Sequence, residues 1–247
     1  MLGLAVALTG GCASLSPGEA SLPPAVGMSP WAAPAPGQSG ATATWQHYKL
    51  PGKTPSQFKY ARIEGRDALA VNAVSSASMV RRKLAVEPDQ LGSLRFSWKV
   101  PELIAQADLA LRDADDSPVR IVLAFEGDRR RLSPRDAMLS ELSLALTGEE
   151  MPYATLMYVW CNQRDLDTVV KSPRTDRIRT VVVESGSRRL NQWLDYERNI
   201  RADYERAFGE APGALVGIAI MTDSDNTRST ARAWYGPVKL APRRSGR

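Results

Sequence analysis

Leu94-Arg95-Phe96-Ser97-Trp98-Lys99-Val100 is the stretch of sequence that most clearly decides the fold. Its apolar side chains, Leu94, Phe96, Trp98 and Val100, occupy every second position. A period of two places these four side chains on one face of an extended strand and the polar ones on the other. The stretch therefore predicts a half-buried β-strand that contributes one face to a hydrophobic core.

Strand signals of this kind recur along the chain from Trp45 onward. They predict strands over residues 45–50, 58–64, 68–74, 79–84, 119–125, 155–160, 180–183, 214–221 and 230–240. The run 119–125 is continuously apolar, which is typical of a central strand. Because these strands do not alternate regularly with helices, the predicted fold is mainly β, an antiparallel, jelly-roll-like β-sandwich.

Helical spacing of apolar residues is found in two places, which predicts two helical insertions in the sandwich. The first contains Met138, Leu142 and Leu146, with Gly148 just after it. The second is predicted over 190–208, where apolar residues from Leu190 to Phe208 form one stripe before Gly209.

Composition limits the classes of function. The chain has 247 residues, of which 43% are hydrophobic, enough for one sizeable core. Two cysteines, Cys12 and Cys161, and one histidine, His47, are too few for a zinc site built from Cys and His. His47 is also the only candidate base for a Ser-His-Asp triad, and no Gly-x-Ser-x-Gly elbow is present.

Basic residues form short clusters in a chain of net charge +5. The clusters are Arg81-Arg82-Lys83, Arg129-Arg130-Arg131, Arg188-Arg189 and Arg243-Arg244. They are either solvated loop charges or contacts for anionic glycans or lipid head groups. A nucleic-acid partner is not expected, because neither a recognition helix nor a stacking motif accompanies the arginines.

The N-terminus has the features of an export signal. A short apolar run, Leu2 to Leu8, is followed by Leu8-Thr9-Gly10-Gly11-Cys12, which resembles a bacterial lipobox. Such signals are cut before the cysteine, and acyl chains on its thiol anchor the protein to a membrane. The alternative is an ordinary signal peptide with a chance cysteine. By the same resemblance, Ala13 after the cysteine favours an outer membrane lipoprotein facing the periplasm or the cell surface.

The chain is accordingly divided into four parts. Residues 1–12 are the predicted lipoprotein signal, with Cys12 as the lipidation site. Residues 13–44, rich in Ala, Pro and Ser, are predicted to form a flexible tether. Residues 45–242 form the single β-sandwich domain, and 243–247 a basic tail.

Several motifs resemble a bacterial family of unknown function, numbered three thousand and forty-seven in its series. They are Phe96–Val100, Pro152–Trp160, Asp195–Arg198, Met221–Thr227 and Ala231–Gly236. The resemblance covers nearly all of residues 45–240 and implies an envelope protein without an established activity. The closing pattern Ala231–Leu240 is similar to the last strand of galactose-binding-like jelly rolls, where Pro237 would have to sit at a bulge or an edge.

The acidic loop near the C-terminus is the candidate metal site. Asp223, Asp225 and Asn226 offer oxygen ligands at close spacing, and calcium is the cofactor that such a loop would take. The loop contains no glycine and lacks the distal glutamate of an EF-hand. The alternative is a polar turn in which Asp and Asn supply the geometry.

Aromatic residues are the candidate ligand-binding side chains. Trp98, Tyr158, Trp234 and Tyr235 have planar faces that suit sugar rings, although strand spacing also fits a place in the core. Since Trp234 and Tyr235 are neighbours on a strand, they point to opposite faces of the sheet.

The sequence therefore predicts an envelope lipoprotein with a non-catalytic module that binds a polysaccharide or an envelope protein partner. No catalytic residue is assigned. One alternative is a glycan-active hydrolase that uses two carboxylates among Glu126, Asp128, Glu184, Asp223 and Asp225. The other is a scaffold whose helix over 190–208 docks a partner.

Overall fold

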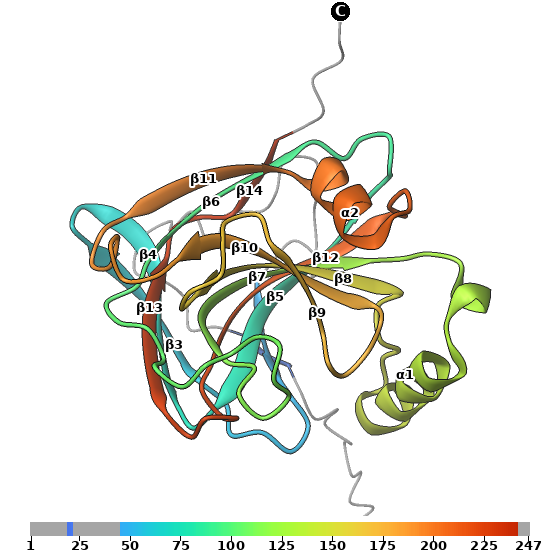
Figure 1. The fold of residues 1–247 in the computed structure, drawn as a ribbon, viewed down its shortest axis with the longest axis horizontal. Helices are drawn as coiled ribbons and strands as arrows, with labels where there is room; N and C mark the ends of the chain where they lie inside the picture. Colours follow the sequence, from blue (N-terminus) through green and yellow to red (C-terminus); the bar gives the residue numbers. More distant parts are fainter. Residues whose placement is uncertain (1–18, 22–44, 242–247) are drawn as a thin grey trace, which may run out of the picture.

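Two β-sheets stacked face to face form the body of the protein in the computed structural model, which describes residues 19–21 and 45–241 (Figure 1). Sheet A has eight strands, in the order β1 (Glu19–Ser21), β2 (Gln46–Lys49), β5 (Ala77–Val86), β12 (Leu215–Asp223), β7 (Ser117–Phe125), β8 (Ala154–Cys161), β10 (Ile178–Ser185) and β9 (Val169–Lys171). Sheet B has the order β11 (Leu194–Asn199), β6 (Ser93–Lys99), β13 (Thr230–Tyr235), β4 (Arg66–Val74) and β3 (Gln57–Ile63), with β14 (Lys239–Ala241) also paired to β6. The strands pair antiparallel, apart from β8 and β10. The predicted mainly β sandwich with two helices is confirmed.

The core lies between the two sheets. The strand β6 contributes the predicted face, because Leu94, Phe96 and Trp98 are all buried in it. Across the interface, the ring of Tyr158 on β8 stacks on Phe96, with centroids 5.8 Å apart and planes 11° apart. The apolar run predicted as a central strand is β7, which lies between β12 and β8 in sheet A. Alternation of side chains in β6 thus sets which face of sheet B meets sheet A.

The predicted last strand is interrupted at Pro237. Tyr235 pairs with Trp98, whereas Lys239 pairs with Arg95, so three residues of this segment face two residues of β6. Such a mismatch is a bulge, where a residue without an amide hydrogen removes no ladder bond. The closing segment is therefore two short strands, β13 and β14, on the same side of β6.

The first predicted helix is confirmed as α1 (Pro134–Thr147). It begins after Ser133, whose hydroxyl accepts a hydrogen bond from the backbone N–H of Asp136. It ends at Gly148, which adopts the left-handed conformation with φ of 75°. A side-chain cap and a left-handed glycine are the usual ends of a helix.

The second predicted helix, over 190–208, is wrong in its first half. Its residues Leu194–Asn199 form strand β11, which pairs with β6, and only α2 (Ile200–Phe208) is helical. Leu194 and Tyr196 face the core from the strand, while Ile200 and Tyr204 face it from the helix. Apolar residues from two different elements therefore mimic one helical stripe. Neither helix in the described part of the chain has the length and hydrophobicity of a bilayer span.

The predictions for the two ends of the chain mostly lie outside the described residues, among them Cys12, the signal segment and the basic tail. The exception is β1, three residues of the segment predicted to be a flexible tether. Here Ala20 pairs with His47 of β2 at the edge of sheet A. Backbone pairing at a sheet edge does not require an apolar sequence. The tether over residues 13–44 stays a prediction.

The outer face of sheet A, which points away from sheet B, is also apolar. Val159, Cys161 and Val182 form a second cluster there, covered by Leu109 from the loop between β6 and β7. Another part of that face lies opposite α1, across an open space. This incompletely covered region contains the largest groove described below.

Candidate functional site

A groove of about 620 Å³ lies between α1 and the outer face of sheet A. Strands β5, β12, β7 and β8 form its floor, and α1 forms one wall. Most side chains that line it are aliphatic: Leu139, Leu142 and Leu146 from α1, and Met79, Val122, Ala124, Met157 and Ala219 from the sheet. Grooves of this size with mainly apolar walls are typical of small-molecule sites.

The groove exists because α1 does not bury its leucines. The buried side chains of this helix are polar, those of Asp136 and Ser140. By contrast, Leu142 is 52% exposed and Leu146 60% exposed. Of the seven large hydrophobic side chains that are strongly exposed among the described residues, four lie on α1. Exposed apolar side chains gathered on one element mark a binding surface more often than scattered ones do.

Polar contacts hold the N-terminal end of α1 in place. The carboxylate of Asp136 accepts hydrogen bonds from the hydroxyls of Thr175 and Ser133. Arg129 donates from Nη1 to the hydroxyl of Ser140, at 3.2 Å. These contacts fix the first half of the helix without filling the space beneath its second half.

The other end of α1 is tied to β5 by an ion pair. Glu149, just after the helix, accepts two hydrogen bonds from the guanidinium of Arg81, at 2.6 and 2.9 Å, and one from Lys83, at 2.5 Å. The hydrogen bond from Arg81 is the largest cause that lowers the pKa of Glu149, to about 2, with Lys83 contributing. The guanidinium of Arg81 also lies 4.0 Å from the ring centre of Tyr48. The cluster Arg81-Arg82-Lys83 thus lies in a strand, not in a solvated loop as one alternative had it.

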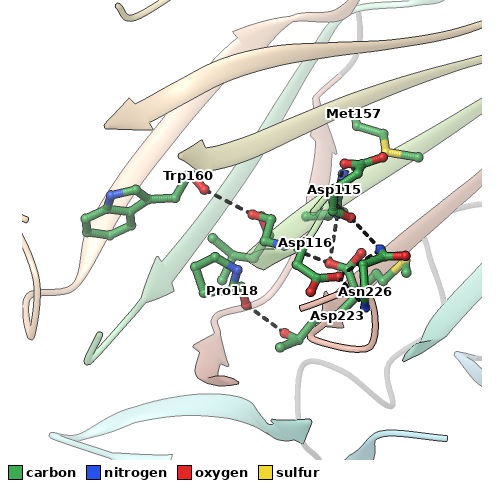
Figure 2. Close-up of polar contacts among 12 residues, drawn as sticks. Asp115, Asp116, Pro118, Met157, Trp160, Asp223 and Asn226 are labelled. Atoms are coloured by element: carbon green, nitrogen blue, oxygen red, sulfur yellow. Dashed lines mark hydrogen bonds and ion pairs between the residues drawn. The ribbon is translucent and has the colours of Figure 1, made fainter. Parts of the chain in front are cut away.

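The predicted metal residues come together at the corner where β7 begins and β12 ends. Figure 2 shows Asp223 and Asn226 beside Asp115 and Asp116. Carboxylate oxygens of Asp116, Asp223 and Asp225 all lie within 4.8 Å of one another. Sequence reasoning missed Asp115 and Asp116, since they precede β7 and are distant along the chain.

A buried arginine occupies this acidic corner. Arg120 donates from Nε to Asp223, at 2.9 Å, and from Nη2 to Asp115, at 2.8 Å. Burial alone would lower the pKa of Arg120, but Asp223 and Asp115 together raise it, so the guanidinium stays charged. Burial raises the pKa of Asp223 to about 6, against the opposite effect of Arg120.

The other oxygens of the corner also have donors. Lys53 forms an ion pair with Asp225, and Asp116 accepts hydrogen bonds from the N–H and hydroxyl of Thr227, at 2.7 and 2.6 Å. The side-chain oxygen of Asn226 accepts from Arg174, at 3.1 Å. Protein cations and hydrogen-bond donors thus already bind the carboxylate and amide oxygens of this corner. These contacts hold the loop before β7 and the loop after β12 together. Calcium binding stays a prediction.

Three of the four predicted ligand-binding aromatic residues lie in the core. Trp98, Tyr158 and Tyr235 are fully buried, so their rings are out of reach of a ligand in solvent. The hydroxyl of Tyr235 donates to the carbonyl of Met221, at 2.6 Å, and accepts from the N–H of Arg120, at 3.2 Å. Trp234 is half-buried and points to the opposite face of sheet B. Alternation predicted the opposed directions of this pair and placed Trp98 on the core face of its strand, but it did not show that Tyr158 is buried.

A second cleft, of about 600 Å³, lies on sheet B beside the bulge at Pro237. Its lining is more polar than that of the first groove. Ion pairs cross it, from Arg66 to Asp195 at 2.8 Å and from Arg95 to Glu197 at 3.0 Å. All four of these charged side chains are strongly exposed to solvent.

Of the carboxylates proposed for a hydrolase, Asp223 and Asp225 meet at the acidic corner, where Arg120 and Lys53 pair with them, and the other three lie elsewhere. Glu184 is buried and accepts hydrogen bonds from Tyr196, at 2.7 Å, and Arg189, at 2.8 Å. Asp128 pairs with Arg130 at the surface. Glu126 lines the groove under α1, where Arg129 contacts it at 3.8 Å and also contacts Glu150 at 3.3 Å. This last pair is the one that faces an open groove.

Comparison with known proteins gives one match by sequence and several by structure. Residues 43–239 match the family described as Protein of unknown function (DUF3047). No protein among the curated ones matches the chain.

The structural similarities are distant. The xyloglucanase domain of NopAA from Sinorhizobium fredii, solved with cellobiose, has 9% identity and a TM-score of 0.42, covering 81% of this chain and 93% of its own. A variant of the Cel12A cellulase of Rhodothermus marinus has 8% identity and a TM-score of 0.44, covering 83% and 95%. A structure titled "CBM4 structure and function" has 7% identity and a TM-score of 0.38, covering 89% and 100%.

The raised pKa of Asp223 predicts a pH dependence of stability. In the folded protein this carboxyl holds its proton up to about pH 6, whereas in the unfolded chain it loses the proton near 3.8. Since the folded state then binds more protons between these values, the free energy of unfolding should fall as pH rises through this window, by up to about 3 kcal/mol. Urea unfolding at pH 4, 5 and 6 measures the slope. Asp223→Asn should flatten it, and an equal slope in both proteins would contradict the prediction.

Proposed function

The chain belongs to the DUF3047 family, and since that description carries no activity, we propose from the geometry that it is a binding module that holds a largely aliphatic molecule in the groove beneath α1. The matched residues, 43–239, agree closely with the range expected from the sequence motifs. The observation that carries the proposal is an open groove with the solvent-exposed side chains of Leu142 and Leu146 on its wall. Burying one such side chain fully against a ligand is worth about 1.5–3 kcal/mol.

The proposal includes attachment to the cell envelope. Acyl chains on Cys12 would hold the module at a membrane surface, as expected for an outer membrane lipoprotein. The support is the lipobox-like segment Leu8–Cys12. A membrane is also a source of aliphatic molecules, so anchor and groove fit a common role.

A glycan is the second candidate ligand, and the cleft on sheet B favours it. Exposed charged side chains on both sides of that cleft offer donors and acceptors to hydroxyl groups. The groove beneath α1 is lined mainly by aliphatic side chains, with Arg81, Lys83 and Thr155 among the polar side chains of its floor. The two candidate ligands, an aliphatic molecule and a glycan, would therefore bind at different places on the protein.

Hydrolysis of a glycan is less well supported than binding. Glu126 and Glu150 are the carboxylates at the open groove, and Arg129 contacts both. A hydrolase needs the space between its two carboxyls for the scissile bond and, in inverting enzymes, a water. Here the guanidinium of Arg129 lies close to both carboxylates, which favours a structural role for the pair.

Substitutions in the groove should abolish ligand binding. In the double variant Leu142→Gln and Leu146→Gln, affinity for a fluorescent aliphatic probe should fall at least tenfold, because two apolar contacts are lost. The control is Met138→Gln with Leu144→Gln, which changes exposed residues of α1 outside the groove lining. Probe fluorescence gives the dissociation constants. A wild-type protein that binds no probe, or equal losses in both double variants, would rule out the groove as the site.

The glycan candidate predicts binding of polysaccharide to sheet B. Affinity electrophoresis of the domain with soluble polysaccharides should show retardation, which Asp195→Ala with Glu197→Ala reduces several-fold. The groove double variant serves as the control and should be retarded like the wild type. Absence of retardation with all polysaccharides would remove this candidate.

The anchor predicts a modified cysteine. Mass spectrometry of the mature protein from membranes should find Cys12 as the first residue, carrying acyl chains on its thiol. Cys12→Ser should release the protein into the soluble envelope fraction. An unmodified mature N-terminus at another position would contradict this part of the proposal.

A further inference from the structure

The groove beneath α1 has a basic end. Arg81 and Lys83 both line it, and because they are two residues apart on β5 they project from the same face of sheet A. The side chain of Arg81 is 17% exposed and that of Lys83 is 48% exposed, so water reaches both. The ring of Tyr48, which supports the guanidinium of Arg81, also lines the groove.

We infer that the ligand of this groove is a single-chain fatty acid whose carboxylate binds Arg81 and Lys83 in the place taken by Glu149. This inference rests on the proposed function, since it names the chemistry of the ligand at the same site.

Glu149 already shows that the basic end accepts a carboxylate. Both of its oxygens are bound by the two guanidinium nitrogens of Arg81, and one is also bound by Lys83. Paired donors of this kind match the planar geometry of a carboxylate. Glu149 lies on the loop after α1 rather than on the sheet, and its side chain is 36% exposed, so a ligand carboxylate can compete with it for the same donors.

The walls next to this end suit an unbranched hydrocarbon chain. Val122, Ala124 and Ala219 on the floor offer no hydrogen-bonding side-chain groups, and Leu142 and Leu146 face them from α1. A ligand with polar groups along its length would leave those groups without partners, which costs free energy. An aliphatic chain with one terminal charge avoids that cost.

The charges elsewhere on the rim orient such a ligand. Glu126 and Glu150 also line the groove, and both contact Arg129. Their carboxylates would repel an anion placed beside them, whereas Arg81 and Lys83 attract it. The carboxylate of the fatty acid therefore lies at the β5 end.

Replacement of Glu149 also loosens α1. The hydroxyls of Ser143 and Thr147 donate to the backbone carbonyl of Glu149, at 2.9 and 3.1 Å, so this residue is tied to the last turn of the helix. The N-terminal half keeps its own contacts through Asp136 and Thr175. Displacement of Glu149 from β5 thus frees the C-terminal end of the helix to move away from the sheet while its first turn stays in place.

The test compares two ligands of equal chain length, lauric acid and its neutral alcohol, dodecanol. Displacement of the aliphatic probe gives both dissociation constants, and their ratio isolates the contribution of the carboxylate. In the double variant Arg81→Gln and Lys83→Gln, lauric acid should bind at least tenfold more weakly and dodecanol about equally well. Glu149→Gln should act in the opposite direction and favour lauric acid over dodecanol at least fivefold more than the wild type does. Arg95→Gln, on sheet B, is the control for a lost surface charge.

The possible outcomes distinguish failure of the carboxylate inference from failure of the proposed function. If both ligands displace the probe but neither variant changes the ratio, the groove binds aliphatic molecules and the carboxylate inference is wrong. If the wild type binds neither ligand nor probe, the proposed function fails and the inference fails with it. An unfolded double variant does not obscure the result, since Glu149→Gln predicts a gain in selectivity that damage to the fold would not produce.

Discussion

The apolar outer face of sheet A is the constraint on which the rest of the molecule depends. Strands β7, β8 and β10 carry aliphatic side chains on both faces, yet sheet B covers only one of them. The other face has to be shielded by whatever the loops supply. The loop carrying Leu109 shields one half closely, and α1 shields the other half loosely. A groove with leucine walls is the consequence of that loose cover.

Polar side chains, rather than apolar packing, determine where α1 lies. The helix is attached at its start through Asp136 and Thr175 and beyond its end through Glu149 and β5. The first attachment is a buried hydrogen bond, whereas the side chain of Glu149 is 36% exposed, so water weakens its ion pair with Arg81. An element held in this way moves more readily than one held by a packed core. At the corner where β7 begins and β12 ends, Arg120 and Asp223 are buried and join these two strands. The network at Glu149 therefore allows α1 to move, whereas the network at Arg120 holds a corner of the sandwich in place.

Much of the fold is predictable from local sequence. Alternation at Leu94–Val100 and the continuous run at 119–125 predicted the strands β6 and β7, and Pro237 was expected at a bulge or an edge and lies at a bulge. The spacing at 190–208 misled because β11 and α2 are consecutive and both face one core. The site was harder to predict. The cluster Arg81–Lys83 and the leucines of α1 are each visible in the sequence. That they line one groove depends on where α1 lies relative to sheet A, which the local sequence does not determine. Likewise, burial of Tyr158 and Tyr235 depends on which faces of the two sheets pack together.

The position of a bound fatty acid tests most directly the claim that the groove beneath α1 is the binding site. In methyl NMR with uniformly carbon-13-labelled lauric acid, intermolecular Overhauser effects report which side chains lie within a few ångströms of the ligand. The groove predicts contacts from the chain to the methyl groups of Val122, Ala219, Leu142 and Leu146, which line it from both sides. Contacts confined to sheet B, or none to these four residues in a protein that binds the acid, would contradict the assignment of the groove as the binding site.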